Sequence, residues 1–124
     1  MRIISGTGKS FLIRAIEQLL NGNDIDYKDS TLPTCVLLAP TGVAALNIGG
    51  STIHAALRLP VTSDVKPLNP SLLTRFQHAW RRVRYLLIDE RSMMGCRLLH
   101  IIDMRLREVT TPLHPLVFAG LSVI

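Results

Sequence analysis

The chain has 124 residues, 48% of them hydrophobic, and its 14 lysines and arginines against nine acidic residues give a formal net charge of +5. This length suits one small domain, and the absence of an apolar run of roughly 18 residues excludes a membrane-spanning helix. The positive charge is compatible with a polyanionic partner such as ATP or a nucleic acid, and the unpaired spacing of Cys35 and Cys96 predicts reduced thiols in an intracellular protein.

A glycine-rich stretch near the start runs directly into an apolar helical pattern. In such a loop, backbone N–H groups converge on phosphate oxygens, a lysine supplies positive charge and a hydroxyl ligates Mg²⁺. The stretch predicts a phosphate-binding P-loop formed by Gly6, Thr7, Gly8, Lys9 and Ser10. The full pattern has another glycine where this chain has Ile3, a β-branched residue that tolerates a left-handed turn poorly. Because the loop begins so near Met1, we expect the strand that leads into it to be missing.

The next segments predict a helix, a loop and a buried strand. Residues 10–21 carry apolar side chains at helical spacing, and Gly22 is the expected stop; these side chains are Leu12, Ile16, Leu19 and Leu20. Residues 22–33 are polar and loop-forming. Residues 35–39 form a short continuous apolar run ended by Pro40, which is typical of a parallel strand buried on both faces.

Residues 40–54 are rich in small side chains and predict a turn, a short helix, a second turn and the start of another helix. Gly42 and the Gly49-Gly50 pair permit tight turns. Ser51 or Thr52 can cap the helix that carries His54. Because segments that leave the carboxyl ends of parallel strands line the ligand crevice, we expect this segment to face a ligand.

A prolyl loop at residues 60–69 precedes another predicted helix. Asn69 is the expected N-cap and Pro70 the first helical residue of a helix that extends to about Arg82. Its inner face is predicted to carry Leu72, Leu73, Phe76 and either Ala79 or Trp80. Its basic end could meet a nucleic-acid backbone, although a solvated helix terminus is the commoner explanation of such charges; it holds Arg75, Arg81, Arg82 and Arg84.

The apolar run at residues 85–88 ends in two adjacent acids, Asp89 and Glu90. An unpaired carboxylate at the end of a buried strand is costly unless it meets a cation, and beside a P-loop that cation is Mg²⁺. We therefore expect Asp89 to hold the metal through water or Ser10, and Glu90 to polarise the water that attacks the γ-phosphate. An alternative is that the two acids merely terminate a strand at the surface.

The remaining residues predict one more helix and one more strand. Residues 95–107 are amphipathic, with an expected outer pair between Asp103 and Arg107 and a core face of Leu98, Leu99, Ile102 and Leu106. A turn at 110–115 leads to a predicted strand at 117–124, which we expect to be cut short.

Three stretches together resemble the Pif family of DNA helicases, relatives of RecD among the superfamily-one motors that move 5′ to 3′. They are residues 6–10 (Gly-Thr-Gly-Lys-Ser), 39–54 (from Ala-Pro-Thr-Gly to Thr-Ile-His) and 87–93 (Leu-Ile-Asp-Glu-Arg-Ser-Met). A P-loop alone is shared with kinases, GTPases and transporters. The segment from Pro-Thr-Gly to Thr-Ile-His discriminates, and the resemblance extends over nearly the whole chain.

The resemblance implies an α/β P-loop NTPase fold, with a RecA-like parallel sheet flanked by helices. Residues 1–124 would be a partial helicase domain 1A, lacking its first strand, the end of its last strand and the second motor domain. ATP and Mg²⁺ would bind at residues 6–10, with Ser10 and Asp89 on the metal and with Lys9, Asp89 and Glu90 as catalytic residues. Single-stranded DNA would be held by backbone N–H groups and hydroxyls at Thr41, Gly42, Ser51, Thr52 and His54.

The implied function is that of a fragment of an ATP-dependent 5′-to-3′ DNA helicase. The resemblance further implies roles in DNA repair, the DNA damage response, recombination and telomere maintenance, with single-stranded DNA or DNA junctions as partners. It also implies a monomeric motor located in the nucleus or mitochondrion, and a fragment that is inactive alone.

The sequence is also compatible with two other functions. Ile3 and the early start of the P-loop favour a non-catalytic, degenerate helicase remnant, from a mobile element or a duplicated copy, with weak nucleotide or single-strand binding. The other alternative is an unrelated P-loop ATPase or nucleotide kinase. The Thr-Ile-His segment and the lack of a recognisable acceptor lid count against it.

Overall fold

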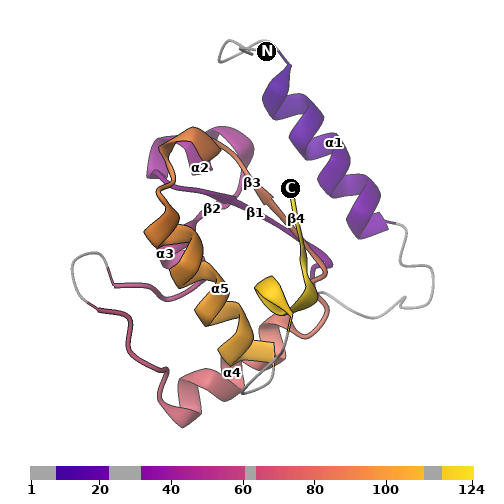
Figure 1. Cartoon of the computed structure of the whole chain (residues 1–124). Coiled ribbons are helices and arrows are strands. Elements are labelled where there is room, and N and C mark those ends of the chain that lie inside the picture. Colours follow the sequence, from indigo (N-terminus) through magenta and orange to yellow (C-terminus); the bar gives the residue numbers. More distant parts are fainter. Residues whose placement is uncertain (1–7, 23–31, 61–63, 111–115) are drawn as a thin grey trace.

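The computed structural model describes residues 8–22, 32–60, 64–110 and 116–124 (Figure 1). Within these ranges four strands form one sheet in the order β2-β1-β3-β4, and every pairing is parallel. The strands are β1 (Cys35–Ala39), β2 (Ser51–Thr52), β3 (Tyr85–Ile88) and β4 (Ser122–Val123). The predicted α/β architecture, a parallel sheet flanked by helices, is confirmed.

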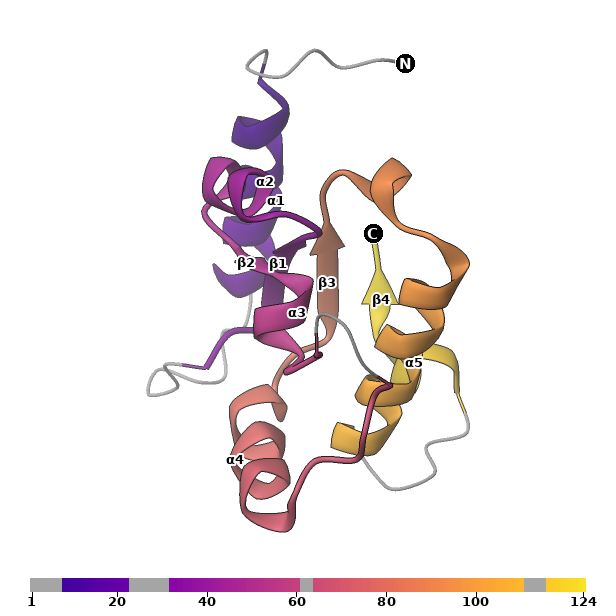
Figure 2. The same cartoon turned by 90° about the vertical axis from the view of Figure 1, so that its left-hand side faces the viewer.

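Helices cover both faces of this sheet (Figure 2). One face carries α1 (Lys9–Gly22) and α2 (Gly42–Ile48), and the other carries α3 (Ile53–Ala56), α4 (Pro70–Trp80) and α5 (Cys96–Thr110). There are also two short 3₁₀ helices. The first, η1 (Arg91–Met93), follows β3, and the second, η2 (Val117–Gly120), precedes β4. Among the described helices, none combines the length and apolar character that crossing a membrane requires.

The two central strands are buried on both sides, as their apolar runs predicted. Side chains alternate along a strand, so Leu38 and Leu86 enter the core under α3, α4 and α5, whereas Leu37 and Leu87 enter the core under α1 and α2. The strands pair in register from Cys35 opposite Tyr85 to Leu38 opposite Ile88. This double burial brings the carboxyl ends of β1 and β3 side by side.

Helix α1 lies against the sheet through a narrow stripe. Its half-buried Ile13, Ile16 and Leu20 pack on the core under α2, and no residue of the helix is fully buried. Leu12 and Leu19, which also lie at helical spacing, do not pack on the sheet and are 55% and 63% exposed. The stripe follows i, i+3 and i+7 spacing, which turns both leucines away from the sheet.

Polar side chains near the two ends of α1 bind it to its neighbours, α2 and the start of β1. Arg14 donates hydrogen bonds to the carbonyls of Asn47 at 3.2 Å and Ile48 at 3.4 Å, at the end of α2. Asn21 Oδ1 accepts the N–H groups of Thr34 and Cys35, each at 2.9 Å. The second contact joins the end of α1 to the start of β1, so the first residues of α1 reach the carboxyl end of the sheet.

The helix at 70–80 agrees with its predicted caps. Asn69 Oδ1 accepts the N–H of Leu72 at 2.8 Å, and Pro70 opens the helix. Trp80, rather than Ala79, takes the inner position and stacks on buried Phe76 with ring centroids 5.2 Å apart. The helix ends at Trp80, two residues earlier than predicted.

The predicted strand at 117–124 is mostly wrong, since the strand formed is only Ser122–Val123, with main-chain hydrogen bonds to β3 continuing at Ile124. Residues Phe118 and Ala119 have φ values of 51° and 54°, in the left-handed region, so this part of the chain cannot continue a strand. The Phe118 N–H instead donates to Asp103 Oδ1 at 2.6 Å. The predicted pair between Asp103 and Arg107 is present at 2.9 Å, but it faces this turn and is partly buried.

Candidate nucleotide and nucleic-acid site

The candidate site lies where α1 begins, beside the carboxyl ends of β1 and β3. Gly8 has φ of 95°, a left-handed conformation that favours glycine, and its carbonyl accepts the Leu12 N–H at 2.9 Å. Lys9 is the first residue of the helix and Ser10 the second, and both are half-buried. The predicted nucleotide-binding residues Gly6 and Thr7 lie outside the described residues, as does Ile3.

Lys9 and Asp89 form an ion pair at this end of the sheet. Lys9 Nζ lies 2.5 Å from Asp89 Oδ1 and 4.0 Å from Glu90 Oε1. Asp89 is 9% exposed, and its backbone N–H donates to the Leu38 carbonyl at 2.9 Å, which extends the contact between β3 and β1. The three predicted catalytic residues are thus adjacent in space although 80 positions separate the lysine from the first acid.

The hydrogen-bonding capacity of this ion pair is only partly used. Asp89 Oδ1 is buried, and the Lys9 contact leaves it without an aligned hydrogen-bond donor among the described residues. The side-chain interaction with Asp89 raises the pKa of Lys9, partial burial opposes the rise, and the charges of Asp89 and Glu90 reinforce it. Lys9 therefore remains protonated at neutral pH. Any stabilisation from the pair is complete below the ordinary lysine pKa and is lost as pH rises through the raised value.

Glu90 occupies an unusual backbone conformation. Its φ of 56° and ψ of 40° place a residue with a side chain in the left-handed region, which costs on the order of 1–3 kcal/mol and is found mainly at functional sites. The Glu90 side chain is 43% exposed, whereas that of Asp89 is buried. The two adjacent acids thus have different environments: one faces the lysine inside, and the other can meet water.

These residues fit a Mg²⁺–nucleotide complex. Magnesium prefers oxygen ligands and is usually held by one or two carboxylates together with substrate phosphates. The buried Asp89 Oδ1, which lacks an aligned donor, and the hydroxyl of Ser10 supply such ligands. In the described part of the chain no cluster of three or more His, Cys, Asp or Glu residues could hold a metal by itself. Phosphate oxygens would have to complete the coordination.

The predicted single-strand segment, residues 40–54, borders the same end of the sheet. Thr41 caps α2 by accepting the Ala44 N–H, and Thr52 caps α3 by accepting the Ala55 N–H, both at 3.2 Å. A capping hydroxyl still carries its own O–H donor, so either threonine can donate to a phosphate. Ser51 is exposed in β2, and His54 is half-buried in α3.

Two glycines of this segment, Gly42 and Gly50, have different surroundings. A Cβ at Gly50 would lie 2.5 Å from the Leu37 carbonyl oxygen, so glycine here allows β2 to approach β1. Gly42 is exposed at the start of α2, and a Cβ there would meet nothing within 4 Å. The fold therefore requires Gly50 but gives no reason for glycine at position 42.

Sequence reasoning missed Arg105, which is 2% exposed inside the core. Its position carried a signal: Ile102, Arg105, Leu106 and Val109 share one helical face, so the arginine lies in an otherwise apolar stripe. A charged residue within an apolar stripe predicts either a buried ion pair or a ligand contact.

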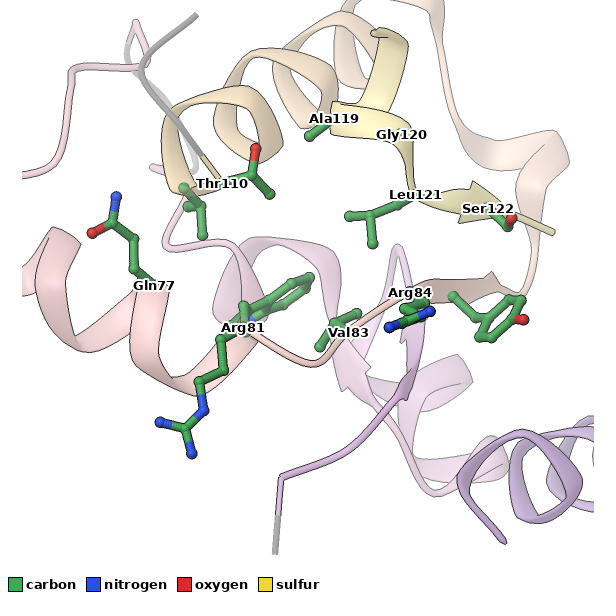
Figure 3. Close-up of a pocket in the computed structure, with 12 residues that line it drawn as sticks. Gln77, Arg81, Val83, Arg84, Thr110, Ala119, Gly120, Leu121 and Ser122 are labelled. Carbon is green, nitrogen blue, oxygen red and sulfur yellow. The ribbon is translucent and has the colours of Figure 1, made fainter. Parts of the chain in front are cut away.

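A separate pocket of about 600 Å³ opens at the opposite end of the sheet (Figure 3). Val83, Val109 and Ala119 supply its buried apolar lining. Arg81 and Arg84 also border it, but the guanidinium of Arg81 points away from it. None of the predicted site residues lines this pocket.

Comparison with known proteins identifies the family. Residues 3–124 match the sequence profile described as PIF1-like helicase. The chain belongs to the PIF1-like helicase family. It is 33% identical over 125 residues to the ATP-dependent DNA helicase PIF4 of Trypanosoma brucei brucei and 32% identical over 123 residues to the ATP-dependent DNA helicase PIF1 of Saccharomyces cerevisiae. Each alignment covers 97% of this chain, which spans only 14% and 13% of those proteins.

Solved PIF1-family structures have the same fold. The Pif1 helicase from Bacteroides, in complex with ADP-AlF3 and ssDNA, superposes with a TM-score of 0.70 at 27% identity, over 96% of this chain and 25% of that one. Pif1 helicase from Candida albicans gives a TM-score of 0.66 at 29% identity, over 96% of this chain and 26% of that one. This PIF1-like chain thus corresponds to part of the helicase motor region.

Proposed function

We propose that the chain is part of domain 1A, the first RecA-like motor domain, of an ATP-dependent 5′-to-3′ DNA helicase. The observation that carries this proposal is the Lys9–Asp89 ion pair, which sits at the sheet end bordered by the single-strand segment. The related Bacteroides protein binds a nucleotide analogue and ssDNA together, which supports assigning both ligands to this end of the sheet.

Each residue of the site has a distinct role in this proposal. Residues 6–10 would hold the nucleotide phosphates, with the charge of Lys9 on the β- and γ-phosphates. Ser10 and Asp89 would hold Mg²⁺, which when bound neutralises the charge that develops on the transferred phosphoryl group. Glu90, the solvent-accessible acid, would orient the attacking water and accept its proton.

The single-strand segment would bind the DNA backbone. Its hydroxyls and N–H groups at Thr41, Gly42, Ser51 and Thr52 suit phosphate oxygens, and His54 adds a side-chain contact. The net charge of +5 supports a polyanionic partner. In this proposal the whole protein is a monomeric motor that acts on single strands or junctions in DNA repair, the DNA damage response, recombination and telomere maintenance, in the nucleus or mitochondrion.

The decisive experiment is Lys9→Ala in the full-length protein. We expect ATP turnover stimulated by single-stranded DNA to fall by on the order of 10³-fold, because the substitution removes the cation that contacts the transferred phosphate. Lys66→Ala, which removes an exposed lysine outside the site, is the matched control and should retain normal turnover. Normal ATPase activity in the Lys9 variant would refute the proposal.

The second candidate, a non-catalytic helicase remnant, is favoured by Ile3 in place of the expected glycine. The same assay separates the two functions. A wild-type protein that binds a fluorescent ATP analogue or single-stranded DNA weakly, yet hydrolyses no ATP, would establish the remnant.

A further inference from the structure

A buried ion pair on α5 lies far from the nucleotide site in sequence but close to the single-strand segment. The Arg105 side chain is 1% exposed, and its Nη1 donates to Glu108 Oε2 at 2.6 Å. A guanidinium has five N–H donors and no acceptor, so its burial is tolerated only when those donors find partners. Glu108 balances the charge, and its side chain remains 24% exposed.

The other donors of Arg105 bind main-chain carbonyls outside α5. Nε donates to Leu57 O at 3.0 Å, Nη2 to Arg58 O at 3.2 Å and Nη1 to Lys66 O at 3.3 Å. Glu108 contributes a further bond, because its Oε1 accepts the Leu68 N–H at 2.6 Å. We call this set of contacts the Arg105 clamp. It ties the chain on both sides of residues 59–65 to one turn of α5.

The clamp acts at the end of α3. This helix has only four residues, and Leu57 is its C-cap. A helix so short gains little from its own hydrogen bonds, so its position depends on its neighbours. The last carbonyls of a helix carry partial negative charge, which the guanidinium neutralises. Arg58 adds strain, since its φ of 53° is left-handed, and the clamp binds the carbonyls of Leu57 and Arg58 at that point.

We propose that Arg105, balanced by Glu108, is a positioning residue for single-strand binding. It holds α3 against α5, so the hydroxyl of Thr52 and the side chain of His54 meet the DNA backbone in a fixed geometry. The inference rests on the proposed function. The clamp touches none of the residues assigned to the nucleotide.

The test compares two arginines of the same helix in the full chain. Arg105→Met should raise the Kd for a fluorescent oligothymidylate on the order of tenfold, while the Kd for a fluorescent ATP analogue stays within about twofold. Arg97→Met is the matched control, because Arg97 is 80% exposed and pairs with the exposed Asp64 at 3.6 Å. It removes the same charge without touching the clamp, and both affinities should stay within about twofold.

A local readout distinguishes positioning from general loss of structure. In Arg105→Met, hydrogen exchange should accelerate at the Leu59 and Leu68 amides, which bond to His54 O and Glu108 Oε1. Exchange at the Leu12 and Asp89 amides should be unchanged. The proposal would be overturned if Arg105→Met lost nucleotide affinity and also lost hydrogen-exchange protection at all four amides. The effect of the substitution would then be a general loss of structure. An equal loss of DNA affinity in the Arg97 control would also overturn the proposal, because it would show a charge effect.

A milder variant covers the case in which Arg105→Met does not fold. Glu108→Gln keeps an acceptor for the Leu68 N–H but removes the balancing charge, and it should raise the oligothymidylate Kd with faster exchange at Leu59. Unchanged affinity in that variant would overturn the proposal. Failure of the wild-type chain to bind oligothymidylate would refute the proposed function and this inference with it. Faster exchange at Leu59 and Leu68 with unaltered DNA affinity would refute this inference alone.

Discussion

Two ion pairs among the described residues, Arg105 with Glu108 and Lys9 with Asp89, differ in how completely their hydrogen-bonding groups are satisfied. Arg105 and Glu108 satisfy each other and four main-chain groups besides. Lys9 and Asp89 meet at a single short contact, with the lysine one-third exposed and Asp89 Oδ1 lacking an aligned donor. One pair lies between helix and loop, and the other at the open carboxyl end of the sheet.

The difference separates residues that maintain the fold from residues available to a ligand. A buried pair whose hydrogen bonds are all made stabilises one conformation, and removing one partner exposes the cost of burying the other. A pair with unsatisfied hydrogen-bonding groups can replace its mutual contact with contacts to a ligand, and the fold loses little stability. Substitutions in both pairs and in neighbouring elements test this distinction.

Arg105→Met should lower the free energy of unfolding by about 3–5 kcal/mol, because Glu108 and the freed carbonyls lose their partner. Lys9→Met should lower it less, by about 1–2 kcal/mol, because Asp89 loses its cation but solvent screens the one-third-exposed lysine side of the pair. Urea denaturation of both variants measures the contrast. Equal destabilisation would show that the Lys9 pair also maintains the fold.

Gly50 and Gly42 of the single-strand segment should differ in the same way. Gly50→Ala should destabilise the protein by about 1–3 kcal/mol, because its Cβ would overlap the Leu37 backbone. Gly42→Ala meets open space and should change stability by less than about 0.5 kcal/mol. We expect it to weaken oligothymidylate binding instead. Unaltered binding in Gly42→Ala would remove Gly42 from the DNA contacts.

Asp103 provides an intermediate case with a pH signature. Burial works to raise the pKa of Asp103, but the Arg107 guanidinium and the Phe118 N–H together lower it below its ordinary value of 3.8. A lowered carboxyl pKa adds stability that is present above 3.8 and is lost as pH falls through the folded-state value.

Asp103→Asn should therefore be less stable than wild type by about 1 kcal/mol at neutral pH, and the difference should shrink as pH falls below 3.8 and through the lowered pKa of Asp103. Thermal unfolding between pH 7 and about pH 2 measures this convergence. The control is Asp64→Asn, which removes a carboxylate that is 97% exposed and should change stability by less than about 0.5 kcal/mol at neutral pH. A constant difference across the range would mean that the charge of Asp103 contributes nothing.

Much of the fold could be predicted because its signals are local. The apolar runs of β1 and β3, the Asn69 cap with Pro70, and the Thr52 cap each depend on residues within a few positions. The inner face of α1 could not be predicted in full, because Leu12 and Leu19 fit helical spacing as well as the residues that pack. The turn at Phe118 escaped prediction because its N–H donates a hydrogen bond to the carboxylate of Asp103, 15 positions away, in place of strand pairing.

The sequence by itself indicated the family and predicted the residues of the candidate site. Lys9, Asp89 and the residues from Thr41 to His54 are recognisable because each lies in a short motif whose spacing is visible along the chain. Only the tertiary structure decided that Lys9 contacts Asp89 and that Arg105 grips the end of α3. Those contacts join residues 80 and 48 positions apart. Such contacts form only when the sheet brings distant strand ends and helices together, so no local pattern specifies them.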